Sequence, residues 1–493
     1  MAEPGHIVSN PPMPPSPPPA SPAASISAGY HATEARDRLT KGEKFSYSFG
    51  VVSEHMGSNT LNTLANPIFN TVLGLNPIWI GICLGLMRVW DAVTDPVMGA
   101  ISDNTRTRHG RRRPFMLAGA VAAGGIFPLI WCVSPNWSPT VITIYFLLVC
   151  VAFFTAQTIF SVPYTALGYE LTPDYHERTR LMAWRAYSGK LSALIFPWAL
   201  TFTQLSIWGG DTMLGARWMG VGVGIIVALA GLVPVLFTRE RFYEKACTQN
   251  KIGLLAGIRE TCRNRTFLMM IGILLFTILG TQLVNHLGFY VAAYYLFGGD
   301  IKSAAILGGI AGNIQLVVGL AAVLVLNKLS QRIGKRRALA VSIGLLVFAG
   351  PVTWFSYTPA LPYLSLIVPF VTAPAYAGFW LLISSIKADI CDFDELQTGL
   401  RREGSYASLS AWFTKLAYAS TAILSGFILA WVGFRAELGP AQNPGTLLWM
   451  KVWFSFVPSL SALPALFLVF RFPITEQMAF EVRRQLEERR GRV

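Results

Sequence analysis

The chain alternates long apolar stretches with short polar segments, and this pattern continues from about residue 45 to residue 471. A helix that crosses a bilayer needs about 20 predominantly apolar residues. Long apolar runs without strand-like alternation therefore predict membrane-spanning helices. The pattern predicts twelve of them, at about 45–73, 78–102, 114–133, 140–168, 180–207, 218–238, 266–297, 303–328, 336–355, 361–388, 404–433 and 447–471. We expect an all-α integral membrane protein with twelve transmembrane helices.

The overall composition changes the picture only by excluding other classes of protein. Of the 493 residues, 53% are hydrophobic and 13% are charged, and the mean hydropathy is +0.47. Soluble domains carry about 25% charged residues, so an ordinary soluble enzyme is excluded. The G-x-x-x-x-G-K motif is absent from the sequence, so ATP hydrolysis within this chain cannot drive transport. We expect neither enzymatic activity nor a cofactor.

The basic residues predict the orientation of the chain in the membrane. Lys and Arg total 40 against 26 Asp and Glu, a net charge of +14. Placing both termini in the cytoplasm puts 32 of the 40 basic residues on that side, as the positive-inside rule requires. The surplus is therefore a topology signal and does not indicate a nucleic-acid partner. We expect a multi-pass protein of the cell membrane, surrounded by the lipid bilayer, with both termini cytoplasmic.

The polar segments divide the chain into five parts. We expect residues 1–42, which include PPMPPSPPPASPAASISAG, to form a disordered Pro-rich cytoplasmic tail. Residues 43–238 form a first six-helix bundle and residues 266–472 a second one. Residues 239–265 form a charged cytoplasmic linker between them, and residues 473–493 form a basic cytoplasmic tail.

Two segments of similar sequence indicate an internal repeat. GAISDNTRTRHGRRR (99–113) follows the second predicted helix and NKLSQRIGKRR (327–337) follows the eighth. Each places an Arg, a Gly and a basic triplet at the same point of its six-helix set. Short basic loops recur in many membrane proteins, but the matched position favours a repeat. Two similar bundles around one cavity are the architecture of transporters that work by alternating access.

Three longer segments resemble a known family. They are RVWDAVTDPVMGAISDNTRTRHGRRRPF (88–115), VPYTALGYELTPDYHERTRLMAWR (162–185) and KADICDFDELQTGLRREGSYASL (387–409). The chain resembles the major facilitator superfamily, and more closely its glycoside–pentoside–hexuronide:cation symporters, which include the melibiose permease. The resemblance implies the major facilitator fold and symport of a sugar or glycoside with Na⁺ or H⁺. Vertebrate lysophospholipid symporters share this framework, so an amphiphile is an alternative substrate. A membrane sensor that does not transport is a further alternative.

Charged residues inside the second predicted helix indicate a cation site. Arg88, Asp91 and Asp95 are spaced i, i+3 and i+7 and share one helix face. An ionised side chain at the centre of a span costs about 2.5–3.5 kcal/mol, so such residues mark functional sites. Two carboxylates one turn apart can hold a small cation or share a proton. Alternatively, Arg88 neutralises one Asp and the three residues only connect helices, but one carboxylate would remain unbalanced.

The resemblance implies a ligand set for this cation. The positions that match Asp91 and Asp95 bind the coupling cation in the melibiose permease, together with a Thr that corresponds to Thr158. A family Asn is replaced here by Thr94, which leaves the choice between Na⁺ and H⁺ open. The candidate cation ligands are Asp91, Thr94, Asp95 and Thr158. Asp91 and Asp95 would be the metal ligands if the protein is coupled to sodium.

Polar residues on three predicted helices are candidates for the substrate site. The resemblance aligns the two carboxylates that hold galactosides with His55 and Ser161, and a stacking Trp with Thr165. The cation machinery is thus preserved and the galactoside contacts are not. Ser and Thr often bond to their own helix, and a His can be satisfied by a neighbouring helix. The candidate substrate residues are His55, Arg88, Ser161, Thr165 and Arg185. Glu54 is a candidate replacement carboxylate, but it points about 100° away from His55.

A lone cation in the second half is a candidate for coupling. Lys415 is the one Lys or Arg near the middle of a predicted C-terminal span, and a charged group there needs a partner. Asp91 or Asp95 across the cavity is the candidate partner, and the resemblance implies that this Lys couples the two halves. Alternatively, Lys415 extends to the interface or bonds a backbone carbonyl. We expect a monomer whose partners are a small-molecule substrate and a coupling cation.

Two pairs of glycines have the G-x-x-x-G spacing that permits close helix contacts. They are Gly81–Gly85 in the second predicted helix and Gly308–Gly312 in the eighth. We expect both pairs to serve packing within a bundle rather than dimerisation.

Overall fold

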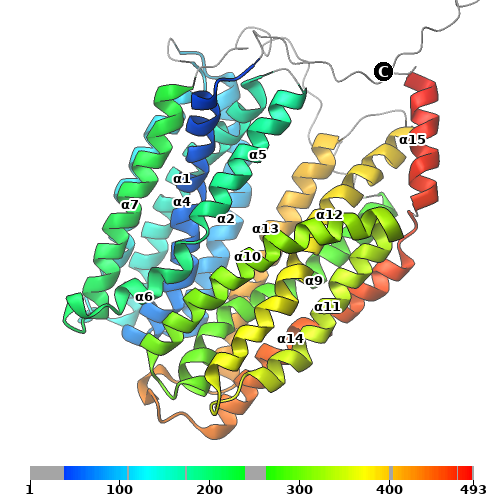
Figure 1. The fold of residues 1–493 in the computed structure, drawn as a ribbon. Coiled ribbons are helices and arrows are strands. Elements are labelled where there is room, and N and C mark those ends of the chain that lie inside the picture. The colour runs from blue at the N-terminus through cyan, green and yellow to red at the C-terminus, as the bar shows by residue number, and fades with distance from the viewer. Residues whose placement is uncertain are drawn as a thin grey trace, which may run out of the picture.

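The computed structural model describes residues 38–107, 110–172, 175–238, 263–398, 403–474 and 476–490. These residues form helices joined by short connections (Figure 1). The N-terminal half comprises α1 (Lys41–Ala65), η1 (Asn66–Val72), α2 (Pro77–Asn104), α3 (Arg113–Ile126), η2 (Phe127–Trp131), α4 (Pro139–Glu170), α5 (Tyr175–Ser192), η3 (Phe196–Trp198), α6 (Ala199–Thr203), η4 (Ser206–Trp208) and α7 (Thr212–Phe237).

The C-terminal half repeats this arrangement. It comprises α9 (Arg265–Tyr290), η6 (Val291–Leu296), α10 (Ile301–Ile333), α11 (Lys335–Ser356), η7 (Pro362–Ile367), α12 (Val368–Thr398), α13 (Glu403–Trp431), η8 (Ala436–Leu438) and α14 (Pro444–Arg471), and α15 (Glu476–Arg490) follows it. We call the end of the molecule where α1 begins and α15 lies the terminal end, and the other end the opposite end (Figure 1).

Ten helices in the described part of the chain are long and apolar enough to cross a membrane. The protein is therefore an integral membrane protein with multiple spans. The two expected spans outside this set are α1, with η1, and α5, continued by η3 and α6. Both helices are more polar than these ten, and both carry ionisable side chains, including Glu54 in α1 and Arg185 in α5.

The fifth expected helix, at 180–207, is broken. The structure has α5 ending at Ser192, the 3₁₀ turn η3, and the short helix α6 ending at Thr203. Pro197 lies in η3, and proline has no N–H for the helical hydrogen bond. The first expected helix also changes character, because it continues from Ala65 into the π-helical segment η1.

The internal repeat is visible in local structure. Asn76 and Asp300 each cap the helix that follows them, α2 and α10, through their side-chain oxygens. At the terminal end, Gly110 and Gly334 have φ angles of 97° and 85°, which only glycine adopts without strain. These paired positions are the same distance apart along the chain in both halves. The two halves of the described chain are therefore related by an internal repeat.

Basic residues close each bundle in the same way. Arg113 Nε donates to Val235 O in α7 at 2.8 Å, and Arg336 Nε donates to Val469 O in α14 at 3.0 Å. Each arginine thus donates to a carbonyl in the last turn of the final long helix of its own half, where carbonyls lack the regular helical partner four residues on. The basic triplets therefore have a structural role at the terminal end.

Glycines bring α2 and α13 into close contact at the opposite end. A Cβ atom added to Gly81 would lie 2.5 Å from Ala422 O, and one added to Gly85 would lie 2.6 Å from Ile423 Cγ1. On α13, a Cβ atom at Gly426 would lie 2.5 Å from Pro77 O. The Gly81–Gly85 pair therefore packs one half against the other, rather than packing helices within one bundle.

A second contact between the halves joins α10 to η3. A Cβ atom at Gly309 would lie 2.9 Å from Trp198 Cδ2, and one at Gly312 would lie 2.8 Å from Pro197 Cβ. The side-chain amide of Asn313, oriented to suit its neighbours, accepts a hydrogen bond from Trp198 Nε1 at 2.9 Å. The expectation that Gly308 and Gly312 serve packing within one bundle is wrong, because a Cβ at Gly308 meets open space and Gly312 contacts η3 of the other half.

This contrast gives a matched test of the closure at the opposite end. Gly309→Leu should force α10 away from η3, at a cost of about 1–3 kcal/mol for overpacking. Gly308→Leu is the control, since its side chain enters open space on the same helix. Spin labels at Ile207 and Lys302, both exposed, should report a longer mean distance in Gly309→Leu only. Equal distances in both variants would contradict this account of the closure.

Candidate functional site

Oxygen ligands from α2 and α4 meet halfway along the bundle. Thr158 Oγ1 of α4 donates to Asp95 Oδ1 of α2 at 3.2 Å. Thr94 Oγ1 lies 3.5 Å from Thr158 Oγ1 and donates to Trp90 O at 3.0 Å. The structure thus brings together three of the four candidate cation ligands, and Thr158 is only 3% exposed.

Arg88 and Asp91 form a looser pair one turn away. Arg88 Nη1 lies 3.8 Å from Asp91 Oδ2, and the two side chains are 24% and 14% exposed. The guanidinium also lies over the ring of Phe154, with Cζ 5.6 Å from the ring centroid. At 3.8 Å this contact is an ion pair rather than a well-formed hydrogen bond. Asp91 therefore keeps oxygen lone pairs that another cation can use.

Lys415 joins the C-terminal half to this site. Its ammonium group in α13 donates to Asp95 Oδ2 in α2. The side chains are 26% exposed for Lys415 and 36% exposed for Asp95, so water reaches the pair. Asp95 thus accepts from Thr158 with one oxygen and from Lys415 with the other. The negative charges of Asp91 and Asp95 are therefore matched by the positive charges of Arg88 and Lys415.

A second ion pair lies on the N-terminal half. Arg185 Nη2 of α5 lies 2.5 Å from Glu54 Oε2 of α1. The guanidinium of Arg185 lies over the ring of Tyr164, at 5.4 Å. Gln157 Nε2 donates to the backbone carbonyls of Ser53 and Glu54, at 3.1 Å each. Sequence reasoning did not select Gln157 or Tyr164, since neither carries a charge that would mark it within a span.

The remaining candidate substrate residues lie around this pair. His55 is exposed on α1, and its Nδ1 would lie 4.0 Å from a Cβ added to Gly189 of α5. Ser161 and Thr165 are half-buried on α4. Within the described part of the chain, neither forms a hydrogen bond to Arg185. The structure therefore pairs Arg185 with Glu54 and leaves the two hydroxyls separate from that pair.

The C-terminal half contributes polar groups opposite Arg88. His286 of α9 and Tyr418 of α13 both interact electrostatically with Arg88. Gln282 is half-buried one turn before His286, while the side chain of Asn285 lies outside the described residues. Arg88 therefore lies between the carboxylates of α2 and the polar wall of the second half.

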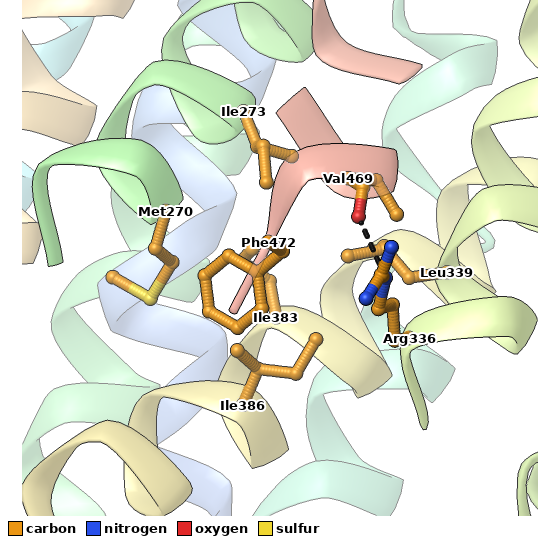
Figure 2. A pocket seen from close by; sticks show the side chains of 8 residues that line it. All are labelled: Met270, Ile273, Arg336, Leu339, Ile383, Ile386, Val469 and Phe472. Atoms are coloured by element: carbon orange, nitrogen blue, oxygen red, sulfur yellow. Dashed lines mark hydrogen bonds between the residues drawn. The ribbon is translucent and has the colours of Figure 1, made fainter. Parts of the chain in front are cut away.

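A small apolar recess lies elsewhere, at the terminal end of the C-terminal half (Figure 2). It is lined by Met270, Ile273, Arg336, Leu339, Ile383, Ile386, Val469 and Phe472. Its one charged group, Arg336, already donates to Val469 O, as Figure 2 shows. The recess offers no free polar group for a hydroxylated ligand, so we do not assign the substrate site to it.

Two repeated bundles with paired charges midway between their ends define a membrane transporter. The sequence model of the family described as MFS/sugar transport protein matches residues 46–476. The chain belongs to this family, the major facilitator superfamily, and within it is similar to glycoside:cation symporters.

Several relatives are similar over almost their whole length. The isoprimeverose transporter of Lactiplantibacillus pentosus is 25% identical over 461 residues, which cover 90% of this chain and 94% of the relative. The putative glycoside/cation symporter YagG of Escherichia coli is 25% identical, covering 92% and 96%. The sodium-dependent lysophosphatidylcholine symporter 1 of Gallus gallus is 26% identical, covering 93% and 91%.

Solved structures show the same fold. The nucleoside transporter NupG superposes with a TM-score of 0.59 at 14% identity, over 90% of this chain and 100% of NupG. A D-xylose–proton symporter superposes with a TM-score of 0.55 at 14% identity, over 88% and 95%. The major facilitator fold expected from the sequence is confirmed.

The pairing of Lys415 with Asp95 predicts a specific stability pattern. Lys415→Met and Asp95→Asn should each lower the melting temperature in detergent, because each leaves one charge of the pair without its partner. The double variant should recover most of the loss, with a coupling energy of about 0.5–3 kcal/mol. Additive losses would show that the two groups do not interact.

Proposed function

We propose that the protein is a secondary active transporter that carries a sugar or glycoside together with a cation by alternating access. The ion pair between Lys415 and Asp95 carries this proposal. It joins the two halves at the point where two carboxylates and two threonine hydroxyls can bind a cation. A cation that occupies Asp95 therefore acts directly on the contact between the halves.

The coupling cation would be held by Asp91, Thr94, Asp95 and Thr158. Carboxylate and hydroxyl oxygens suit a hard cation such as Na⁺, and two nearby carboxylates can also share a proton. Either cation would compete with Lys415 for the Asp95 carboxylate. The halves would then separate from this contact only when the carrier is loaded, so that cation and substrate each raise the other's affinity.

The substrate would bind beside this site, against the candidate residues of the N-terminal half. His55, Ser161, Thr165 and Arg185 offer donors and acceptors for hydroxyl groups, and Arg88 lies between them and the second half. The close contacts of α2 with α13 and of α10 with η3 close the opposite end. The substrate site is therefore reached from the terminal end in this conformation.

An amphiphile is the second candidate substrate. The observation that favours it is the similarity to the sodium-dependent lysophosphatidylcholine symporter 1 over 93% of this chain. Uptake of a radiolabelled lysophosphatidylcholine, set beside uptake of labelled glycosides in the same vesicles, separates the two candidates. We favour a sugar because the matched family is one of sugar transporters.

We further propose that the protein is a monomer in the cell membrane, with the terminal end in the cytoplasm. Asn136 and Glu437 lie in connections at the opposite end, whereas Lys41 and Gln331 lie at the terminal end, and all four are exposed. In whole cells, an impermeant maleimide should label single cysteines at residues 136 and 437 only. Permeabilised cells should show labelling at all four positions. The reverse pattern in whole cells would invert the proposed orientation.

Neutralising either carboxylate of the cation site should abolish coupling. Asp91→Asn and Asp95→Asn remove a negative charge with little change in size, so we expect a loss of cation-driven uptake of at least about tenfold. The matched control is Asp211→Asn, because Asp211 caps α7 outside the site and Asn caps a helix equally well. Vesicles should contain equal amounts of each variant. Normal gradient-driven accumulation by either site variant would refute the assignment.

A further inference from the structure

We propose that Glu54 sets the charge of the substrate that this site accepts. By pairing with Arg185, Glu54 neutralises the guanidinium that the candidate substrate wall of α1, α4 and α5 would otherwise offer to an acidic sugar. The site then selects an uncharged, hydroxyl-rich sugar over the corresponding uronate. This inference rests on the proposed transport function and names the substrate class of the same site.

The geometry of the pair supports a persistent neutral unit. Arg185 Nη2 and Glu54 Oε2 are 2.5 Å apart, and their side chains are 22% and 19% exposed. With about four-fifths of each side chain buried, separating the two charges would leave each in a poorly solvated place. A carboxylate ligand would have to displace Glu54 from Arg185, or else lie beside it as a second negative charge.

The carboxylate of the pair suits hydroxyl groups. Arg185 Nε is buried and has no hydrogen-bond partner among the described residues, so it does not meet a ligand in this conformation. Glu54 uses Oε2 for its contact with Arg185, which leaves Oε1 outside that contact. A hydroxyl can donate to this oxygen, whereas an ionised carboxylate only accepts. A neutral sugar can therefore hydrogen-bond to Glu54, and a uronate carboxylate would face the Glu54 oxygens.

Neighbouring contacts hold the pair in place before any ligand arrives. Gln157 of α4 donates to the carbonyls of Ser53 and Glu54, which fixes the backbone of α1 at this point. Tyr164 supports the guanidinium plane of Arg185 and donates its hydroxyl to Tyr47 O at 2.8 Å. A site whose groups are already oriented loses less entropy on binding and discriminates more sharply between ligands.

Other cations of the spans do not replace Arg185 on this wall. Arg88 pairs with Asp91, and Lys415 pairs with Asp95. Lys190 is exposed on α5, and five residues along a helix place it about 140° around the axis from Arg185. The charge state of the wall therefore depends on Glu54.

The test uses pairs of sugars that differ only at the carboxyl group. Methyl glucoside and methyl glucuronide, with methyl galactoside and methyl galacturonide beside them, are measured as inhibitors of cation-driven uptake of the best neutral glycoside. The wild-type protein should prefer the neutral member. Glu54→Gln keeps the size of the side chain but frees the charge of Arg185, so the preference should shift by about tenfold or more toward the uronide.

A second variant and a control make the outcome decisive. Glu54→Asp shortens the side chain and weakens its contact with Arg185, so it should shift the preference toward the uronide by a smaller factor. This variant provides the test if Glu54→Gln does not fold. Glu437→Gln, exposed in a connection at the opposite end, should change nothing. An unchanged ratio in both Glu54 variants, or a wild-type preference for the uronide, overturns this inference while transport stands. Failure of the wild-type protein to take up any sugar overturns the proposed function itself.

Discussion

The arrangement of this protein follows from the cost of placing an ionised side chain inside a bilayer. A carboxylate or guanidinium there is stabilised by an opposite charge, and three such pairs lie away from the helix ends among the described residues. Arg88–Asp91 lies within one helix, Arg185–Glu54 joins two helices of one half, and Lys415–Asp95 joins the two halves. Only the third pair is separated when the halves move apart, so only its electrostatic free energy changes with that motion. A ligand that replaces Lys415 at Asp95 therefore weakens the contact between the halves. The other two pairs only set the charge and the geometry of the proposed binding sites.

Close packing at the opposite end supplies the second constraint. Glycines on α2 and α13, and on α10 against η3, let backbone and rings approach to distances that a Cβ atom would prevent. The two closures are equivalent under the internal repeat, because α2 and α10 follow the first helix of each half and carry Gly85 and Gly309 at matched positions. Such surfaces can part and close again with few side-chain rearrangements, which suits a rocking motion of two rigid bundles.

The parts of this structure that the sequence predicts are those with a large energetic signature. Long apolar runs predict the spans, and the charges of Asp91, Asp95 and Lys415 stand out because each is costly in that setting. Sequence spacing left two partners open for Lys415, and the structure pairs it with Asp95. That choice depends on how α2 and α13 cross, which no spacing along one helix records. Glu54 and Arg185 are 131 residues apart, so their pairing likewise requires the packing of α1 against α5. The rotation of α10 about its own axis, which the sequence does not specify, decides that Gly309 rather than Gly308 faces η3.

Competition between Lys415 and the coupling cation for Asp95 is the central claim of this account. Titration of Na⁺, and separately of protons, into the purified wild-type and Lys415→Met proteins measures it directly. If Lys415 competes for the carboxylate, its removal should tighten binding of the coupling cation, by about tenfold for each 1.4 kcal/mol of interaction lost. Unchanged or weaker cation binding in Lys415→Met would contradict the account.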